Sequence, residues 1–307
     1  MSVIVLGSIN MDLVVHTPRL PQLGETLIGK RFETIPGGKG ANQAVAVARQ
    51  GIDTYMIGRV GDDAFGTSLR QNLQQYGVKC DRITIDASAA SGVALIEVND
   101  QGDNHIVVVP GANGQVGPDE LNYLSDYVLM AKVLLLQLEI PLDIVYSAVK
   151  VAHNYGIKVI LDPAPAKSLP LDLYPMLDIL TPNQTEAEQL TGLSITDMQT
   201  AIAAGTTLQK RGVSTVIITM GEKGLLICQE NNVRHVPAFD IEAVNTVGAG
   251  DAFNGGLAAA LVEEHSIDIA VVKGMATAAL SVTQSGTQSS MPNSQTLNAF
   301  LSKNYKY

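Results

Sequence analysis

A run of small residues stands directly before a carboxylate at positions 248–251. Gly248, Ala249 and Gly250 let the backbone approach a ligand closely, because their side chains are absent or small. The apolar, alanine-rich stretch at 252–263 predicts a buried helix. The small residues would then lie at its N-terminus, where free amide groups and the positive end of the helix dipole attract an anion.

Asp251 follows these small residues and has two interpretations. As an N-cap residue it would only stabilise the start of the helix. As a general base it would take a proton from a hydroxyl group while that hydroxyl attacks a phosphoryl group bound by the 248–250 amides. This segment alone leaves both interpretations open.

A second polar segment, Gly7-Ser8-Ile9-Asn10-Met11-Asp12, follows a short β-branched strand predicted at residues 2–6. In an extended chain the side chains of Asn10 and Asp12 point to the same side. An amide beside a carboxylate suits the adjacent hydroxyls of a vicinal diol. The alternative is an ordinary turn at the end of a strand.

A glycine-rich segment at 36–43 precedes a helix predicted over 41–50. Its glycines indicate backbone held close to a ligand. Lys39 either contacts a phosphate or a substrate hydroxyl, or is an ordinary exposed lysine. The segment is not a Walker A loop, because Gly40 rather than Ser or Thr follows Lys39.

Composition narrows the class of protein. A net charge of −10 argues against a nucleic-acid or anionic-membrane partner. An apolar fraction of 46% supports a large core, and no apolar run of about 18 residues predicts a membrane span. Cys80 and Cys228 are far apart, and the five histidines lack metal-ligand spacing. We therefore expect a cytoplasmic protein with reduced thiols and no metal centre built on His or Cys.

Buried runs alternate with helical patterns along most of the sequence. This alternation predicts one α/β domain over residues 1–307, with a central, mostly parallel β-sheet sandwiched between helices. The predicted strands are residues 2–6, 54–58, 133–138, 158–161, 179–181 and 214–219, and the predicted helices are residues 41–50, 64–76, 119–129, 142–155, 185–190, 198–211, 252–263 and 268–283.

Two segments lack this alternation and predict a small separate β-sheet. Prolines and glycines interrupt residues 13–36, where short strands are expected at 26–28 and 31–34. Residues 92–110 predict a hairpin with strands at 93–98 and 105–109. A small sheet with a bare face must cover a ligand or pair with another chain, so we expect a lid that also forms a homodimer surface.

Ligands of parallel sheets bind beyond the carboxyl ends of the strands, and polar residues follow several predicted strands here. Glu139 and Asp162 are two of them. Asn183 and Glu186 stand at a helix start, where they either form a capping box or organise Mg²⁺ and ATP phosphates. The segment 219–224 has the composition of a loop around a nucleotide, or of a plain hairpin turn.

Together these segments resemble the PfkB family of carbohydrate kinases. Gly-Gly-Lys-Gly-Ala-Asn and Gly-Ala-Gly-Asp are specific to that family, and the resemblance covers residues 2 to about 301. Gly7–Asp12 and Gln137-Leu138-Glu139 point to its ribokinase subgroup. The segments that carry the resemblance are 7–12, 37–43, 138–139, 183–186, 219–224 and 245–255.

The resemblance implies a role for each matching residue. Asp251 would be the base for the primary hydroxyl of the sugar, and the amides of Gly248, Ala249 and Gly250 would form the anion hole. The sugar would be held by Asn10, Asp12, Gly38, Lys39, Gly40, Ala41, Asn42, Glu139 and Asp251. ATP and Mg²⁺ would be held by Asn183, Glu186, Thr219, Met220, Gly221, Glu222, Lys223, Gly224 and Gly250. A monovalent cation, K⁺, would be held by Asn245, Val247, Ser281, Gln284, Gly286 and Ser290.

One departure bears on the cation. The family pattern usually begins with Asp where this sequence has Asn245, which removes the formal charge that would favour K⁺. The resemblance implies D-ribose as the sugar. Fructose, deoxyribose, a nucleoside or a keto-deoxy sugar acid are alternative substrates, and a sugar-binding regulator without turnover is the alternative from a different class.

Overall fold

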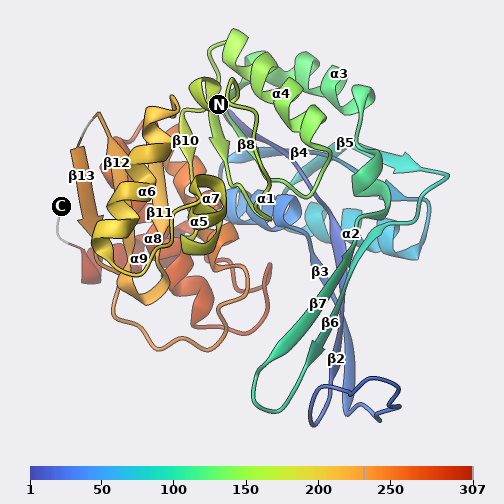
Figure 1. Cartoon of the computed structure of the whole chain (residues 1–307). Helices are drawn as coiled ribbons and strands as arrows, with labels where there is room; N and C mark the ends of the chain where they lie inside the picture. The colour runs from blue at the N-terminus through green and yellow to red at the C-terminus, as the bar shows by residue number, and fades with distance from the viewer. Residues whose placement is uncertain (231, 306–307) are drawn as a thin grey trace.

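The computed structural model describes residues 1–230 and 232–305. Its main sheet has the strand order β13-β12-β11-β10-β9-β8-β1-β4-β5 (Figure 1). The pairings from β11 through β5 are parallel, and β12 and β13 add an antiparallel edge. The predicted mostly parallel sheet is therefore confirmed. Its strands are β1 Ser2–Leu6, β4 Asp53–Gly61, β5 Lys79–Asp86, β8 Ala131–Leu136, β9 Lys158–Leu161, β10 Ile179–Leu180, β11 Thr215–Thr219, β12 Leu225–Gln229 and β13 Asn232–Val236.

Helices cover both faces of this sheet. Successive side chains of a strand point to opposite faces, so Val3 and Val5 join one core while Ile4 and Leu6 join the other. Helices α1, α2, α7 and α8 pack on the first face, and α3 to α6 pack on the second. The helices are α1 Lys39–Arg49, α2 Ala64–Gln75, α3 Pro118–Tyr127, α4 Leu142–Asn154, α5 Gln184–Thr191, α6 Met198–Lys210, α7 Ala249–Val262, α8 Ile267–Val282 and α9 Ser294–Asn304, with 3₁₀ turns η1 Gly111–Gln115, η2 Val128–Met130, η3 Tyr174–Met176 and η4 Gly221–Lys223.

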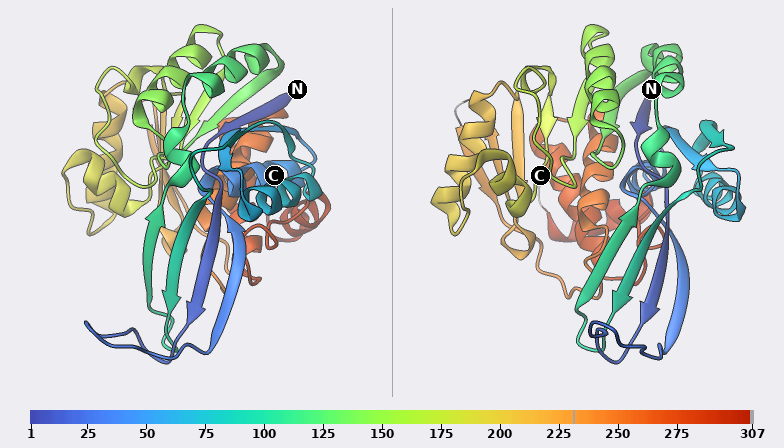
Figure 2. Two further views of the ribbon diagram at one scale, coloured as in Figure 1. Left: turned by 90° about the vertical axis from the view of Figure 1, so that its right-hand side faces the viewer. Right: turned by 45° about the vertical axis from the view of Figure 1, so that its right-hand side comes forward.

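A second, four-stranded sheet with the order β3-β2-β6-β7 projects from the main body (Figures 1 and 2). Its strands are β2 Asn10–His16, β3 Arg31–Gly37, β6 Gly92–Val98 and β7 Asn104–Val109. The predicted small sheet is thus confirmed, although it begins at residue 10 rather than 13. We call this sheet the lid. The strand expected at residues 26–28 is wrong, because pairing of β2 with β3 ends at His16 and Arg31 and a loop joins them.

Among the strands and α-helices of the described residues, β2, β5, β12, β13 and α9 were not predicted. Strands β5 and β13 carry charged side chains at partly exposed positions, so they lack the buried runs of the central strands. Helix α9 has an apolar face of only a few residues, centred on Leu297 and Leu301. None of the helices in the described part of the chain combines the length and apolar character needed to cross a lipid bilayer.

Candidate active site

Helix α7 begins earlier than its apolar pattern indicates. Gly248 is its N-cap with a left-handed φ of 80°, and a Cβ there would lie 2.5 Å from Thr287 Cγ2, so glycine is required on both counts. Asp251 lies in the first turn and is not the N-cap, so that interpretation is wrong. The Ala249 amide donates to Thr246 O at 3.2 Å, whereas the amides of Gly250 and Asp251 lie too early in the helix to have a partner within it.

Asp251 is buried at 5% exposure and is held by two amide side chains of α1. Its Oδ2 accepts from Asn42 Nδ2 at 2.8 Å, and its Oδ1 accepts from Gln43 Nε2 at 3.0 Å. Burial raises the pKa of this carboxyl, while the Lys39 charge and the two hydrogen bonds lower it, and the net direction is upward. A carboxylate with a raised pKa is a better proton acceptor near neutral pH.

Lys39, the first residue of α1, lies among several carboxylates. Burial lowers the pKa of its ammonium, but Asp251, Asp162, Glu139 and Glu186 raise it, so the net direction is upward and the group stays charged. Glu139 and Asp162 follow β8 and β9, so the predicted meeting of polar residues at the carboxyl ends of the strands is observed.

Asp12 and Asp162, like Asp251 and Glu186, have raised pKa values. Burial, together with the Glu139 and Asp251 carboxylates, raises the pKa of Asp12 to about 7. Burial raises the pKa of Asp162 to about 8, with Lys39 opposing and Asp251 and Glu186 adding to the rise. Near neutral pH these two carboxyls therefore carry less negative charge than ordinary acids.

Asn10 and Asp12 lie two residues apart on lid strand β2, as predicted. Asn10 Oδ1 accepts from Asn113 Nδ2 at 2.7 Å, and Asn113 also bonds both backbone groups of Ile9. No sequence pattern indicates that Asn113 positions Asn10, since the two residues are 103 positions apart. Glu139 Oε2 accepts from Ser8 Oγ and from the Lys39 amide, which fixes this acid beside the start of α1.

The glycine-rich segment brings α1 against the β1–β2 connection. Gly38 has φ 89°, and a Cβ there would lie 2.6 Å from the Asn10 amide. The Ala41 amide donates to Ser8 O at 2.9 Å, and the Ala41 side chain is fully buried. Of the predicted sugar-binding residues, Ala41 therefore lies in the core, while Asn42 donates to Asp251.

A cavity of about 830 Å³ lies beside the start of α7. Ala249 and Gly250 form one side of it, and Thr219, Gly221, Glu222 and Gly224 form another. The segment 219–224 does connect antiparallel β11 and β12, so the hairpin interpretation is correct and the same turn lines the cavity. Its apolar wall has the size and character that suit a flat heterocycle, and consists of Phe253, Met275, Ala278, Ala279 and Val282.

Asn183 and Glu186 form the predicted capping box of α5. Glu186 N donates to Asn183 Oδ1 at 2.9 Å, and Asn183 N donates to Glu186 Oε2 at 2.8 Å. Burial raises the pKa of Glu186, and its charge acts on Lys39 and Asp251. Across residues 1–230 and 232–305, no three Asp, Glu, His or Cys side chains gather closely enough to hold a metal ion. A Mg²⁺ ion near Glu186 would take most of its ligands from water and phosphate, as this ion usually does.

The two segments predicted to hold a monovalent cation lie side by side. The Asn245 amide donates to Val282 O at 3.0 Å, and Gly248 packs against Thr287. Asn245 Oδ1 accepts from the Val247 amide at 3.0 Å. The hydroxyls of Ser281 and Ser290 donate to backbone carbonyls at 2.8 and 2.9 Å, which leaves their oxygen lone pairs available. The arrangement is compatible with a small cation but supplies no charge.

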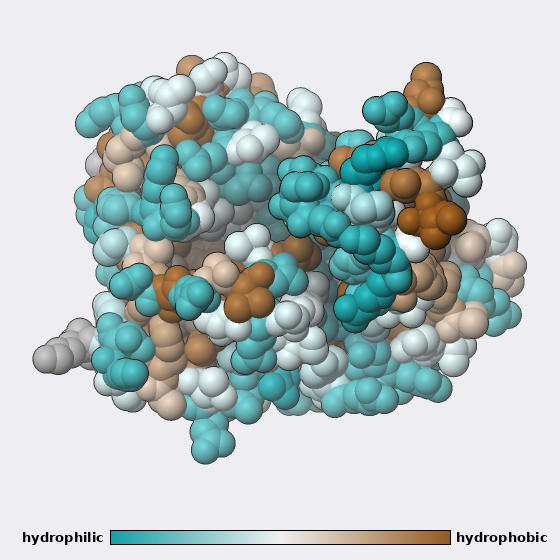
Figure 3. All heavy atoms as spheres, turned by 90° about the horizontal axis from the view of Figure 1, so that it is seen from below, coloured by the Kyte–Doolittle hydropathy of each residue, from teal (hydrophilic) through white to brown (hydrophobic). Residues whose placement is uncertain are grey.

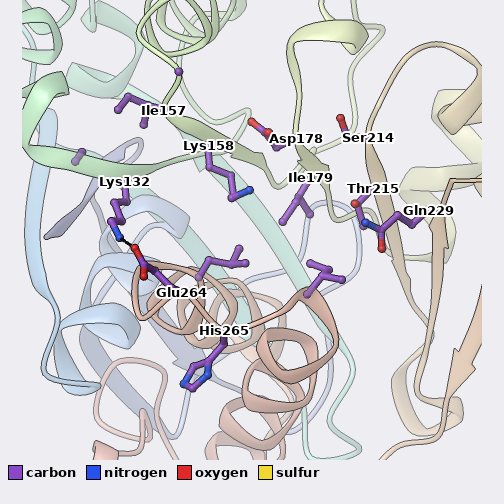
Figure 4. Close-up of a pocket in the computed structure, with 14 residues that line it drawn as sticks. Lys132, Ile157, Lys158, Asp178, Ile179, Ser214, Thr215, Gln229, Glu264 and His265 are labelled. Carbon is purple, nitrogen blue, oxygen red and sulfur yellow. Dashed lines mark hydrogen bonds and ion pairs between the residues drawn. The ribbon is translucent and has the colours of Figure 1, made fainter.

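A further cavity of about 600 Å³ lies at the other end of the parallel strands, beside the amino ends of β8 to β11 (Figure 4). Lys132 pairs with Glu264 across it, and Lys158 and Asp178 also line it. The lining includes no residue that the sequence indicated for chemistry.

Comparison with known proteins finds relatives that match nearly the whole chain. The family model described as pfkB family carbohydrate kinase matches residues 1–294. A ribokinase of Haemophilus influenzae is 41% identical over 297 residues, which cover 97% of each chain. A deoxyribokinase of Salmonella typhi is 39% identical over 305 residues, 99% of this chain and 100% of the relative.

The structure of Arabidopsis thaliana ribokinase complexed with ribose and ATP superposes with a TM-score of 0.91 at 33% identity, over 98% of both chains. This likeness covers the main sheet and the lid alike. The family match and the identities lead to one conclusion: the chain belongs to the pfkB family of carbohydrate kinases.

Proposed function

We propose that this protein is an ATP-dependent kinase that phosphorylates the primary (5-) hydroxyl of D-ribose, giving ribose 5-phosphate and ADP. The observation that carries the proposal is the buried Asp251 carboxylate, one residue after the backbone of Gly250 that lines the large cavity. Family membership makes a sugar hydroxyl the acceptor. The ribokinases among the relatives favour ribose.

In this mechanism Asp251 takes the proton of the sugar hydroxyl as its oxygen attacks the γ-phosphorus of ATP. A bond forms between that oxygen and phosphorus, and the bond to the bridging oxygen of ADP breaks. The amides of Gly248, Ala249 and Gly250 would stabilise the transferring group at the positive end of α7. The Ala249 amide must leave Thr246 O to take part.

The sugar would lie between the lid and α1. Asn10 and Asp12 from β2 would bond adjacent hydroxyls, and Lys39 and Glu139 would contact others. Gly38, Gly40 and Ala41 would shape the site through their backbone, and Asn42 would act through Asp251 as well as on the sugar.

ATP would occupy the cavity of about 830 Å³, with the base against its apolar wall and the phosphates toward Gly250. The turn at Thr219, Met220, Gly221, Glu222, Lys223 and Gly224 would contact the nucleotide. Mg²⁺ would be held near Asn183 and Glu186 and would neutralise the phosphates. Mg²⁺ usually takes few protein ligands and keeps waters and phosphates, which suits a site with one half-buried acid.

We also propose a monovalent cation at Asn245, Val247, Ser281, Gln284, Gly286 and Ser290. These residues are uncharged, and Asn245 Oδ1 already accepts a hydrogen bond, so activation by K⁺ should be weak.

The lid supports a further proposal, a homodimer through the lid sheets. Edge strand β7 is exposed throughout, with Val107 at 59% and Ile106 at 54% exposure. At the right of Figure 3, which views the molecule from below, a few hydrophobic residues in brown lie among mostly hydrophilic ones. An exposed apolar edge of this kind usually pairs with another chain. Sedimentation equilibrium that gives the mass of a single chain at micromolar protein concentration would contradict this proposal.

A sugar panel tests the proposed function. ADP release would be measured with D-ribose, 2-deoxy-D-ribose, D-fructose, adenosine and a keto-deoxy sugar acid, each in K⁺ and in Na⁺. We expect the highest kcat/KM with D-ribose. The deoxyribose arm is needed because a named deoxyribokinase is nearly as similar as the ribokinase. ADP release with none of these sugars, alongside measurable ribose binding, would instead favour a regulator.

Replacing Asp12 with alanine should raise KM for ribose by about 10–100-fold and leave ATP affinity unchanged, because a hydrogen bond to a charged group contributes roughly 1.5–3 kcal/mol. The pKa of Asp12 is raised to about 7, and its ionised form accepts bonds from both hydroxyls. The wild-type KM for ribose should therefore rise as pH falls below about 7.

The Asp12→Ala variant should lack this pH dependence. Asp100→Ala, which removes an exposed lid acid paired with Lys30, is the matched control. Loss of ATP binding in Asp12→Ala would show that Asp12 stabilises the fold rather than binding the sugar.

A further inference from the structure

Gln43 connects two buried acids. Its single Nε2 donates to Asp251 Oδ1 at 3.0 Å and to Asp162 Oδ2 at 2.8 Å. Gln43 is fully buried, and both acids are nearly so. An amide NH₂ group has two hydrogens, so each carboxylate receives one and the donor capacity of this nitrogen is used completely.

A second amide fixes which way Gln43 faces. Gln137 Nε2 donates to Gln43 Oε1 at 2.6 Å, so the oxygen of Gln43 points toward Gln137 and its NH₂ group must face the acids. Gln137 is itself fully buried at the end of β8. The orientation of Gln43 is thus set by the hydrogen bonds at both ends of its amide.

Close packing of two helices leaves little freedom in this bridge. A Cβ at Gly255 of α7 would lie 2.3 Å from Ala46 Cβ and 3.1 Å from Gln43 O on α1. The backbone of α7 therefore runs directly against α1 one turn after Asp251. Asp251 and Gln43 belong to two helices in contact, so a change at Gln43 acts on Asp251 without an intermediate.

Resting on the proposed function, we propose that Gln43 is a positioning residue for the general base: it anchors the Asp251 carboxylate to Asp162 and so fixes the direction in which the free lone pairs of Asp251 face the sugar hydroxyl. Asn42 holds the other oxygen, so the two consecutive amides of α1 determine the plane of the carboxylate. The sugar and ATP are held by other residues, so the role of Gln43 concerns the rate of transfer rather than binding.

The bridge also acts on proton affinity. Burial raises the pKa of the Asp251 carboxyl, and the donated hydrogen bonds from Asn42 and Gln43 lower it because they favour the ionised form. Loss of the Gln43 donor should therefore move the acidic limb of the kcat profile to higher pH. The other charged groups around Asp251 stay in place: Lys39, Asp12, Glu139, Asp162 and Glu186.

The test is Gln43→Met, which keeps the length of the side chain and removes the amide. We expect kcat for ribose to fall by about 10²-fold, the effect of a small displacement of a catalytic group. KM for ribose and the Kd of ATP should stay within about threefold of wild type, and the acidic limb should shift upward.

Gln50→Met is the matched control. Gln50 ends the same helix, and its Nε2 donates to Pro292 O at 2.7 Å, away from the acids. This variant should lose thermal stability but keep kcat and the acidic limb. A structural role of Gln43 would give the same pattern as this control, with a lower unfolding midpoint and an unchanged rate per folded molecule.

Gln137→Met provides a second measurement if Gln43→Met does not fold. It frees the Gln43 amide to turn, and it also removes the buried Gln137 Oε1, which has no hydrogen-bond partner among the described residues. We expect a smaller fall in kcat with the same upward shift of the acidic limb. An unchanged rate and pH profile in both folded variants would overturn the proposal. Failure of the proposed function is distinguishable, because wild type itself would then show no turnover with any sugar.

Discussion

Asp251→Asn should lower kcat for ribose by about 10²–10⁴-fold, the usual cost of losing a general base. Asparagine has nearly the same shape but cannot accept the proton of the hydroxyl. The affinities for ATP and ribose should remain within a few-fold, because in the proposed site other residues would hold both ligands. Equilibrium binding of each ligand and single-turnover phosphoryl transfer would measure the two effects separately.

The amide introduced by this substitution would face donors from Asn42 and Gln43, so folding of the variant must be checked by its unfolding midpoint. Asp268→Asn is the control, since Asp268 lies in the first turn of the next helix and pairs with Arg234 outside the site. A near-normal kcat in folded Asp251→Asn would show that another group takes the proton.

Lys39→Met should lower kcat/KM by on the order of 10²-fold, comparable with removing one donor from a preorganised site. The Lys39 charge lowers the pKa of Asp251 and of Asp162, so its loss raises both. Asp251 would then be protonated over more of the neutral range, and the acidic limb of kcat should move to higher pH. Steady-state kinetics between about pH 5 and 9 would follow this shift.

A suitable control is Lys273→Met, which removes a partly buried lysine paired with Glu263 on the outer side of α7 and α8. This variant should change the stability of the protein and leave kcat/KM and the pH profile as in wild type. If Lys39→Met retained the wild-type pH profile, Lys39 would contact solvent or sugar rather than neutralise the acids.

The sequence was sufficient for elements that depend on local pattern. Buried β-branched runs predicted the central strands, and prolines and glycines separated the lid from them. Strands β12 and β13 were missed because they extend the sheet through antiparallel pairing of β12 with β11 and of β13 with β12, which the expected alternation of strands and helices does not include. The strand expected at 26–28 failed because it has the composition of a strand but no pairing with β2 or β3.

The candidate site likewise contains some residues that the sequence could predict and others that it could not. Gly248 to Asp251 form a continuous segment, so the sequence alone could predict them together as a candidate anion site and base. Gln43 bonds Asp162, which lies 119 positions later in the sequence, and Asp251, which lies 208 positions later. Only the fold brings these three residues together. Asn42 was predicted for the sugar, yet its side-chain nitrogen donates to Asp251. Sequence motifs identified the segments, whereas the separate role of each residue within a segment follows from tertiary contacts.

The short connection between β1 and β2 has a mechanical consequence. β1 ends at Leu6 inside the main sheet, and β2 begins at Asn10 inside the lid, so Gly7, Ser8 and Ile9 alone join the two sheets at this point. Any rotation of the lid about this connection would carry Asn10 and Asp12 with it, while Asp251 would stay with α7. Opening the lid would thus separate the proposed hydrogen-bond partners of the sugar from the proposed base in one movement. A more viscous solvent would then slow product departure more than phosphoryl transfer.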